Sequence, residues 1–243
     1  MNRFLFSIFC LIVILSLQAC DTNDKNSSSA ESFSEEQNVN PGINKYFKDP
    51  DLDPEVWAGR FTGESREVFT QRNKVLEALN IQPGDRIADI GAGSGLYIKL
   101  FAEAVENEGT VYAVDIAQSF LDFIEKKAKS DGLTNVKTVL GQDKTANLSD
   151  SSVDIIFHSD TYHHFEYPAS MNKDLARSLV SGGDLYVLDF KRIEGVSSDF
   201  ILGHVRAGKE VVISEIESSG FVFVEEIDMP DLKENYLLHF SKR

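Results

Sequence analysis

The sequence has few cysteines and few basic residues for its length. Its only two cysteines, Cys10 and Cys20, lie near the start of the 243-residue chain, so the remainder holds no thiol for a disulfide, a nucleophile or a zinc ligand. Lysine and arginine number 24 against 39 acidic residues, which gives a formal charge of −15. This balance excludes binding of nucleic acid through bulk charge, because phosphate contacts need Lys and Arg. We therefore expect no nucleic-acid partner.

Long apolar runs are also scarce. The one clear run, residues 4–17, follows Arg3 and is too short to span a bilayer comfortably as a permanent helix. A single basic residue followed by a short apolar stretch is typical of a secretory signal peptide. The sequence therefore predicts that residues 1–19 are removed.

The end of this run, Leu17-Gln18-Ala19-Cys20, resembles the lipobox of bacterial lipoproteins. The resemblance implies cleavage before Cys20, acylation of its thiol and a lipid anchor in the membrane. It also implies that the globular domain lies on the periplasmic or another extracytoplasmic side. A generic secretion signal or an uncleaved anchor are the alternatives.

The next segment is polar. Residues 21–40 are rich in Ser, Asn, Glu and Asp and bury too little apolar surface to offset the entropy of ordering. We expect residues 20–56 to form the lipidated cysteine and a flexible acidic linker. The folded domain is predicted to cover residues 57–243.

From residue 65 onward, apolar patterns alternate between helix and strand. Helices are predicted at 65–80, from the glycine turn to 104, and at 119–129 and 171–179; strands are predicted at 86–90, 110–114, 136–140, 153–157 and 184–190, the last after a turn at 182–183. Two final strands, 221–226 and 236–240, have no helix between them. This order predicts an α/β fold with a doubly wound, Rossmann-like parallel sheet that ends in an antiparallel hairpin. Ligands of such sheets bind outside the carboxyl ends of the strands.

One glycine-rich motif lies at such a strand end. Asp89-Ile90-Gly91-Ala92-Gly93-Ser94-Gly95 follows the first strand and leads into a helix, where glycines let the backbone approach a ligand closely. A dinucleotide fingerprint needs Gly or Ala where this chain has Leu96, which disfavours an NAD-dependent oxidoreductase. The G-x-G-x-G spacing, with an aspartate two residues before the first glycine, resembles motif I of the class I S-adenosylmethionine-dependent methyltransferases.

The resemblance extends over residues 84–243. It implies a seven-stranded mixed sheet with the last strand antiparallel, S-adenosylmethionine as the methyl donor and a small-molecule acceptor. Asp115 closes the second strand, where a carboxylate can accept both ribose hydroxyls; capping of the next helix is the alternative. Asp143, or less strongly Gln142, would read the adenine amino group. The residues expected to bind the donor are Asp89, Gly91, Ala92, Gly93, Gly95, Asp115, Ile116, Asp143 and Asp160.

The segment after the fourth strand holds the candidate catalytic residues. His163 or His164 would remove a proton from the acceptor, and the ring of Tyr162 would stabilise the sulfonium cation. A metal site built from His158, Asp160 and the two histidines is the competing interpretation. Strand alternation sends some of these side chains to opposite faces, so we expect no metal.

Two residues outside this loop are candidate substrate contacts. Arg66 lies in the helix before the first strand, and His204 lies where a helix is predicted to open after the fifth strand. Two functions remain open at this stage. One is an active small-molecule methyltransferase that works by in-line displacement. The other is a membrane-tethered cofactor-binding or sensor protein without turnover.

Overall fold

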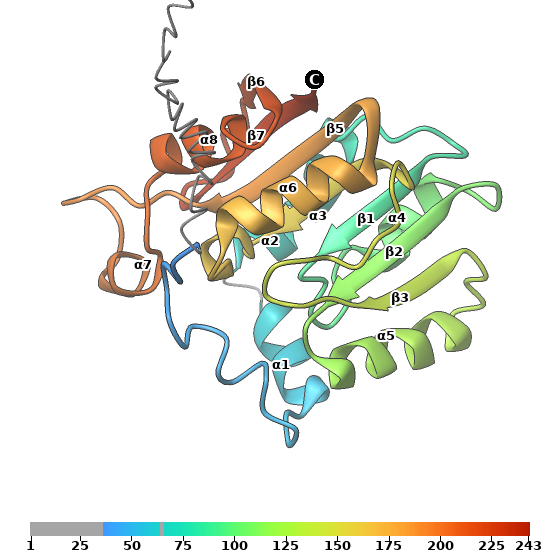
Figure 1. Cartoon of the computed structure of the whole chain (residues 1–243). Coiled ribbons are helices and arrows are strands. Elements are labelled where there is room, and N and C mark those ends of the chain that lie inside the picture. Colours follow the sequence, from blue (N-terminus) through green and yellow to red (C-terminus); the bar gives the residue numbers. More distant parts are fainter. Residues whose placement is uncertain (1–35, 64–65) are drawn as a thin grey trace, which may run out of the picture. The chain divides into compact units, whose positions relative to one another are not determined.

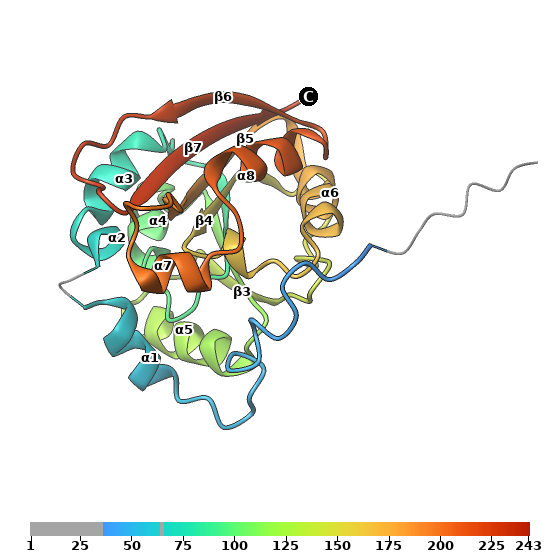
Figure 2. The same cartoon turned by 90° about the vertical axis from the view of Figure 1, so that its left-hand side faces the viewer.

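A computed structural model describes residues 36–63 and 66–243 of the chain (Figures 1 and 2). Contacts within the chain group Glu36–Arg243 as one compact unit. The predicted signal peptide and Cys20 lie outside the described residues.

The described residues form strands and helices in the predicted alternation. The strands are β1 (Arg86–Ile90), β2 (Thr110–Asp115), β3 (Val136–Leu140), β4 (Val153–Ser159), β5 (Leu179–Phe190), β6 (Phe221–Ile227) and β7 (Asn235–Lys242). The helices are α1 (Pro54–Phe61), α2 (Glu67–Thr70), α3 (Arg72–Ala78), α4 (Ile98–Ala104), α5 (Gln118–Ser130), the 3₁₀ turn η1 (Tyr162–His164), α6 (Pro168–Ser178), α7 (Asp199–His204) and α8 (Lys209–Glu217).

These strands form one seven-stranded sheet in the order β3-β2-β1-β4-β5-β7-β6. Strands β1 to β5 pair in parallel, whereas β7 pairs antiparallel with both β5 and β6. The predicted fold class is therefore confirmed, including the antiparallel last strand. The chain runs outward from β1 to β3 and then returns to β4 on the other side of β1, so the switch point lies between β1 and β4.

Helices cover both faces of the sheet, with α3 and α4 on one side and α6 on the other (Figure 2). A hydrophobic core lies on each face of the sheet. Because alternate residues of a strand face opposite sides, the two cores contain different residues of the same strand. In β1, Ile87 packs in the core with Phe101 of α4, whereas Ala88 packs in the core with Leu175 of α6. The strands are apolar on both faces for this reason, as buried parallel strands are.

Two predicted elements differ in detail. The helix predicted over 65–80 is divided by Gln71, whose ψ of 7° is not helical, into α2 and α3. The turn predicted at Gly182-Gly183 lies inside β5, where the pairing with β4 shifts register between Val153 and Ile155. Gly182 has a φ of 73°, which lets the chain form this bulge without leaving the sheet.

The segment before α1 packs on the domain. Glu36 accepts hydrogen bonds from the backbone N–H groups of Ala169 and Ser170 at the start of α6. The backbone N–H of Val39 donates to the carbonyl of Glu166. The domain start predicted near Trp57 therefore lies inside the compact unit, and residues 36–56 form part of its surface.

Candidate functional site

The glycine bend after β1 forms a tight turn at the switch point of the sheet. Gly91, Gly93 and Gly95 have φ values of 75°, 53° and 82°, a region that favours glycine. A Cβ at Gly91 would lie 2.3 Å from Cγ2 of Thr161, in the loop after β4. The bend and that loop therefore approach each other so closely that only glycine fits between them.

Asp115 joins this bend to the end of β2. Its Oδ2 accepts a hydrogen bond from the backbone N–H of Gly93 at 2.8 Å, and its Oδ1 accepts one from Ala117 at 2.8 Å. Burial raises the pKa of Asp115 to about 6, although the N–H groups of Ala117 and Gly93 lower it. The predicted convergence of the glycine bend and this carboxylate is present in the structure. The alternative role, capping of the next helix, is not what the structure shows: Ala117 is the N-cap residue of α5, and the N–H that Asp115 accepts there belongs to Ala117 itself.

Asp89 lies at the base of the same bend. Its side chain is buried and lines the cavity described below. Burial, and then the neighbouring charge of Asp115, raise the pKa of Asp89 to about 8. Two carboxyl groups thus face one recess, where hydrogen-bond donors of a ligand would find acceptors.

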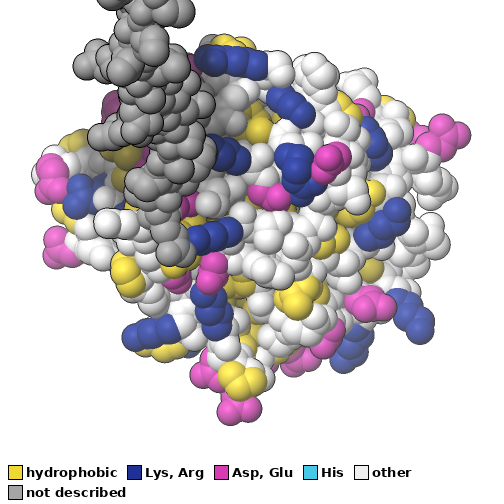
Figure 3. Space-filling model, viewed as in Figure 1, with side chains coloured by type: hydrophobic (Ala, Val, Ile, Leu, Met, Phe, Trp, Pro, Cys, Tyr) yellow, Lys and Arg dark blue, Asp and Glu magenta, His cyan; other side chains and the backbone are white. Residues whose placement is uncertain are grey.

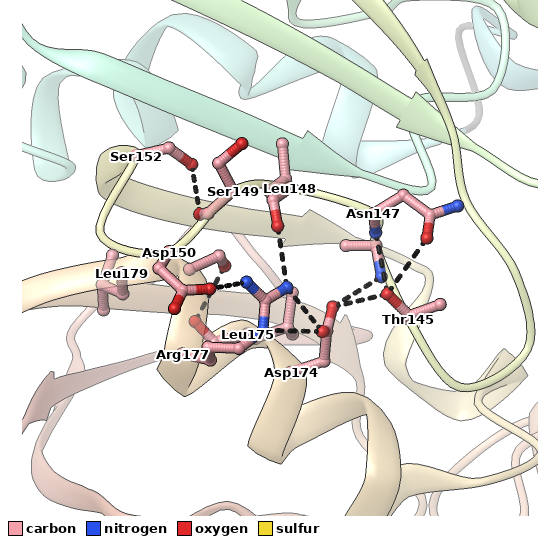
Figure 4. A network of polar contacts seen from close by, with 12 residues as sticks. Thr145, Asn147, Leu148, Ser149, Asp150, Ser152, Asp174, Leu175, Arg177 and Leu179 are labelled. Atoms are coloured by element: carbon pink, nitrogen blue, oxygen red, sulfur yellow. Dashed lines mark hydrogen bonds and ion pairs between the residues drawn. The ribbon is translucent and has the colours of Figure 1, made fainter.

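The loop after β3 carries the residues expected to read adenine. Gln142 and Asp143 both line the cavity, and Oδ1 of Asp143 forms an ion pair with Nζ of Lys48 at 2.6 Å. Figure 4 shows how this loop is held: Asp174 of α6 accepts hydrogen bonds from Thr145 Oγ1 at 3.0 Å and Ala146 N at 2.8 Å.

The same network extends along α6. Arg177 bridges Asp174 to Asp150, and its Nη2 donates to the carbonyl of Leu148 at 2.7 Å (Figure 4). The segment from Thr145 to Asp150 is therefore tied to α6 at several points. This anchoring fixes where Gln142 and Asp143 stand at the cavity wall.

Asp160 begins the loop after β4 with a φ of 48°. Its carboxylate pairs with Arg66 Nη2 and accepts a hydrogen bond from Asn235 Nδ2 at 2.6 Å. Burial raises the pKa of Asp160 to about 6, although the charge of Arg66 lowers it. The structure thus brings together two predicted site residues, Asp160 and Arg66, and adds Asn235 of β7, which the sequence did not indicate.

His163 is buried and held by Asp189, near the end of β5. Its Nδ1 lies 2.7 Å from Asp189 Oδ1, and its backbone N–H donates to Asp189 Oδ2 at 3.0 Å. Burial lowers the pKa of His163, but Asp189 outweighs burial and the net pKa is raised. Sequence reasoning missed Asp189. An acidic residue in the otherwise apolar stretch 185–190 marks Asp189 as unusual, but nothing in the sequence indicates that it meets His163.

His164 and His204 lie next to His163. The ring centroid of His163 is 4.4 Å from that of His164 and 4.9 Å from that of His204. Burial, followed by the charges of the other two histidines, lowers the pKa of His164 to about 2, and burial also lowers that of His204. His204 ends α7 rather than opening a helix, as the sequence had suggested. It nevertheless reaches the predicted site.

Tyr162 and His158 face away from this site. The hydroxyl of Tyr162 donates a hydrogen bond to Glu215 Oε2 at 3.0 Å and accepts one from Asn172 Nδ2 at 2.8 Å, in the core beside α6 and α8. Its ring does not line the main cavity, so the structure argues against its predicted contact with the sulfonium. His158 is fully buried on the same side of the sheet. The set His158, Asp160, His163 and His164 is therefore not gathered around one point.

A cavity of about 860 Å³ joins these groups. Drug-sized ligands occupy cavities of about 300–1,000 Å³. All the residues predicted from sequence to bind the donor line it except Gly95, and so do both predicted histidines, Arg66 and His204. Its wall also includes aromatic side chains: Phe47, Trp57, Phe61, Phe120, Phe190 and Phe200.

On the part of the described surface that is visible in Figure 3, basic and acidic side chains are interspersed rather than gathered by sign. Among the residues that the structure describes, no helix is both long and apolar enough to cross a bilayer.

Comparison with known proteins agrees with this geometry. Residues 88–187 match the family model of a methyltransferase domain. The demethylmenaquinone methyltransferase of Geobacillus kaustophilus is 35% identical over 91 residues, which are 37% of this chain and 39% of the relative. A protein-L-isoaspartate O-methyltransferase of Methanococcus aeolicus is 27% identical over 129 residues, or 52% of this chain and 59% of the relative. The matches thus cover less than two thirds of the length of these curated relatives, 39% and 59%.

A solved structure extends the likeness to the whole fold. The S-adenosylmethionine-dependent methyltransferase of Aquifex aeolicus superposes with a TM-score of 0.70 at 23% identity and covers 79% of this chain and 100% of its own. The fold is therefore the α/β Rossmann-like fold of methyltransferases. Together with the matched domain, it supports a class I S-adenosylmethionine-dependent methyltransferase and implies S-adenosylmethionine as the cofactor.

Proposed function

We propose that this protein transfers the methyl group of S-adenosylmethionine to a small-molecule acceptor. One observation carries the proposal: a single cavity is lined both by Asp115 and Gly93, which are hydrogen-bonded to each other, and by His163, whose ring is held by the buried Asp189 outside the cavity wall. Asp115, beside the glycine bend, can accept hydrogen bonds from the ribose hydroxyls of a nucleoside. His163, oriented by Asp189, can accept a proton next to that nucleoside.

The glycine bend and Asp115 would hold the donor. The carboxylate of Asp115 accepts hydrogen bonds from the ribose hydroxyls, and the backbone at Gly91 and Gly93 lets the donor approach closely. Asp143 and Gln142, on the loop anchored by α6, would receive the adenine edge. When bound, S-adenosylmethionine supplies an electrophilic methyl group on a positively charged sulfur.

His163 would act on the acceptor. Asp189 accepts the hydrogen on Nδ1, which leaves the lone pair of Nε2 available. That nitrogen takes the proton that an acceptor hydroxyl or amine must lose as it is methylated. Asp189 is a positioning residue, because it fixes the tautomer and orientation of the ring.

The cavity wall favours a flat, apolar acceptor. Phe190 and Phe200 line the cavity near the histidines, and aromatic rings pack well against planar molecules. The names of the two relatives point to different acceptors, a demethylated menaquinone and isoaspartate in proteins. The aromatic wall favours the first of these classes, a substituted aromatic or quinone ring.

Release of S-adenosylhomocysteine tests this proposal. The full chain is incubated with S-adenosylmethionine and a panel of phenols, quinones, amines and thiols. We expect product with a ring-bearing acceptor, and His163→Ala should lower kcat by about 10²–10⁴-fold while the Kd for the donor changes little. Donor binding without product across the panel would instead favour the tethered binding or sensor protein.

We also propose that Cys20 is the acylated first residue of a lipoprotein anchored on the extracytoplasmic side. Leu17, Ala19 and Cys20 support this proposal. Phase partitioning in detergent and the mass of the N-terminal peptide test it. The wild-type protein should enter the detergent phase with an acylated peptide, whereas Cys20→Ser should remain in the aqueous phase. An unmodified Cys20 would contradict the proposal.

A further inference from the structure

Three of the five histidines of the chain meet at one point of the cavity wall. His163 and His164 come from η1, and His204 comes from the end of α7, 40 residues later. One nitrogen of each ring can be chosen so that all three lie within 4.8 Å of one another. All three residues line the main cavity.

Two of these rings are already oriented by acceptors on Nδ1. Asp189 Oδ1 lies 2.7 Å from Nδ1 of His163, and Asn44 Oδ1 lies 3.2 Å from Nδ1 of His164. The amide of Asn44 is fixed in turn, because its Nδ2 donates to the carbonyl of His164 at 3.0 Å and to Glu166 at 3.4 Å. Both Nδ1 atoms therefore carry hydrogen, and both Nε2 atoms keep a free lone pair.

This pattern is characteristic of histidines that bind metal. A ligating imidazole usually donates its other N–H to a carboxylate or carbonyl oxygen, which sets the tautomer and strengthens the ligand. In this chain an acidic and an amide side chain, brought from β5 and from the segment before α1, supply those acceptors. General acid–base catalysis requires one such ring, whereas here two adjacent rings each have a hydrogen-bond acceptor at Nδ1.

We propose that His163, His164 and His204 bind a Zn²⁺ ion at the cavity wall. Imidazole nitrogen suits zinc, and three protein ligands with an open fourth position form a known class of zinc site. Zn–N bonds of about 2.0–2.1 Å in a tetrahedron place the nitrogens about 3.4 Å apart. The three nitrogens lie within 4.8 Å of one another, so binding draws the rings closer together; His164 and His204 are both only partly buried.

The charge of the surroundings favours a cation. Asp189 is buried beside His163, the side chain of Asp160 is 8% exposed, and the charges of both act on His163. Arg66 pairs with Asp160, so Asp189 remains as the negative group directly behind the ligand set. A dication bound to three neutral imidazoles is balanced in part by that carboxylate.

The two roles of His163 exclude each other in one molecule. A bound ion occupies the Nε2 lone pair that the metal-free protein offers to the proton of the acceptor. The open position of the ion faces the same cavity, so the zinc-loaded protein presents an electrophile where the metal-free protein presents a base. The metal site itself does not depend on the proposed methyl transfer.

Cobalt titration of the full chain tests the site directly. The protein is purified in mild detergent without a polyhistidine tag, treated with chelator, and titrated with Co²⁺, whose visible spectrum reports coordination. We expect one equivalent to bind with the intense bands of a four-coordinate ion, and Zn²⁺ to displace it. Absence of Co²⁺ and Zn²⁺ binding by the wild-type protein would overturn the proposal.

Two variants locate the ion. His204→Ala should weaken Zn²⁺ binding by more than the roughly 10–100-fold that loss of a supporting partner causes. His239→Ala is the matched control, because His239 pairs with Asp184 away from the cavity and should leave Zn²⁺ binding unchanged. The proposal would be overturned if Zn²⁺ affinity fell equally in both variants, or if it fell in neither. Binding of S-adenosylmethionine, measured on the same samples, should survive in His204→Ala, so failure of the metal site is distinguishable from failure of the donor site.

Discussion

His158 shows how a single buried side chain can cost stability. The ring is fully buried on β4, and neither nitrogen has a well-formed hydrogen bond to a described residue, only a weak interaction with the backbone of Ile90. Burial lowers the pKa of His158 to about 4, so the ring is neutral at physiological pH. An unsatisfied buried polar group costs about 1–3 kcal/mol.

We therefore expect His158→Met to stabilise the protein. Methionine is flexible enough to fill the space beside Phe165 without leaving a polar atom unpaired. Each kcal/mol gained should raise Tm by about 2–4 °C in thermal unfolding. His239→Met is the contrasting variant: it removes the hydrogen bond to Asp184 and should not raise Tm. A lower Tm for His158→Met would contradict this account.

Asp89 gives the stability a defined pH dependence. Burial raises its pKa from 3.8 to about 8, so between these values the folded state holds a proton that the unfolded state has lost. The free energy of unfolding therefore falls as the pH rises through this interval. Asp89→Asn cannot ionise and should lose less stability than the wild type between about pH 5 and pH 8 in urea unfolding. The exposed Asp122→Asn should keep the wild-type slope; an unchanged slope in Asp89→Asn would be inconsistent with the burial argument.

At the scale of elements, α6 anchors the loop after β3, which we propose to face the adenine. Asp174 holds Thr145 and Ala146 with its side chain. Asp174→Ala should weaken donor binding several fold and lower Tm, because the loop after β3 loses two hydrogen bonds to a charged group, each worth about 1.5–3 kcal/mol. Calorimetric titration and thermal unfolding measure both effects.

Asp150→Ala provides the control for this element. Asp150 belongs to the same network, but its side chain is largely exposed and pairs with Nη1 of Arg177. Exposed ion pairs contribute about 0–1 kcal/mol, so donor binding and Tm should hardly change. Equal effects of the two substitutions would show that the network does not position the loop.

Most of the elements were predictable because their patterns are local. Strands such as 136–140 and 153–157 are short apolar runs between turns, and the structure confirms them. Helix α1 was missed, although Asp53 before Pro54 is a helix-start signal, because the surrounding residues look like a polar linker. The bulge at Gly182 was predicted as a turn because its geometry depends on pairing with β4.

The convergence of the glycine bend and Asp115 was predictable for the same reason. The glycine bend and Asp115 each follow a recognisable strand, and β1 and β2 are neighbours in the sheet. The partners of the histidines were not predictable. Asp189, Asn44 and Asn235 come from segments far apart in the sequence, and no local spacing indicates that they meet. We expected Tyr162 at the cavity, but the 3₁₀ turn η1 directs its side chain to the opposite side from His163, toward Glu215.

At the scale of the whole molecule, the site is a consequence of strand order. Because β2, β1, β4 and β5 are successive neighbours and parallel, their carboxyl ends meet at one edge of the sheet. That edge brings Asp115, the glycine bend and Asp160 to one cavity and places Asp189 against His163 of the cavity wall. Residues 36–56 complete the wall through Asn44 and Phe47, so the cavity depends on more than the central sheet.

Calorimetric titration of the full chain with S-adenosylmethionine tests the central claim most directly. The account predicts one binding site in the wild-type protein and a Kd at least about ten-fold higher in Asp115→Ala, a loss of about 1.4 kcal/mol or more. Asp122→Ala, an exposed carboxylate on α5, should bind as the wild type does. Equal affinity of the wild type and Asp115→Ala, or no binding by the wild type, would contradict the account.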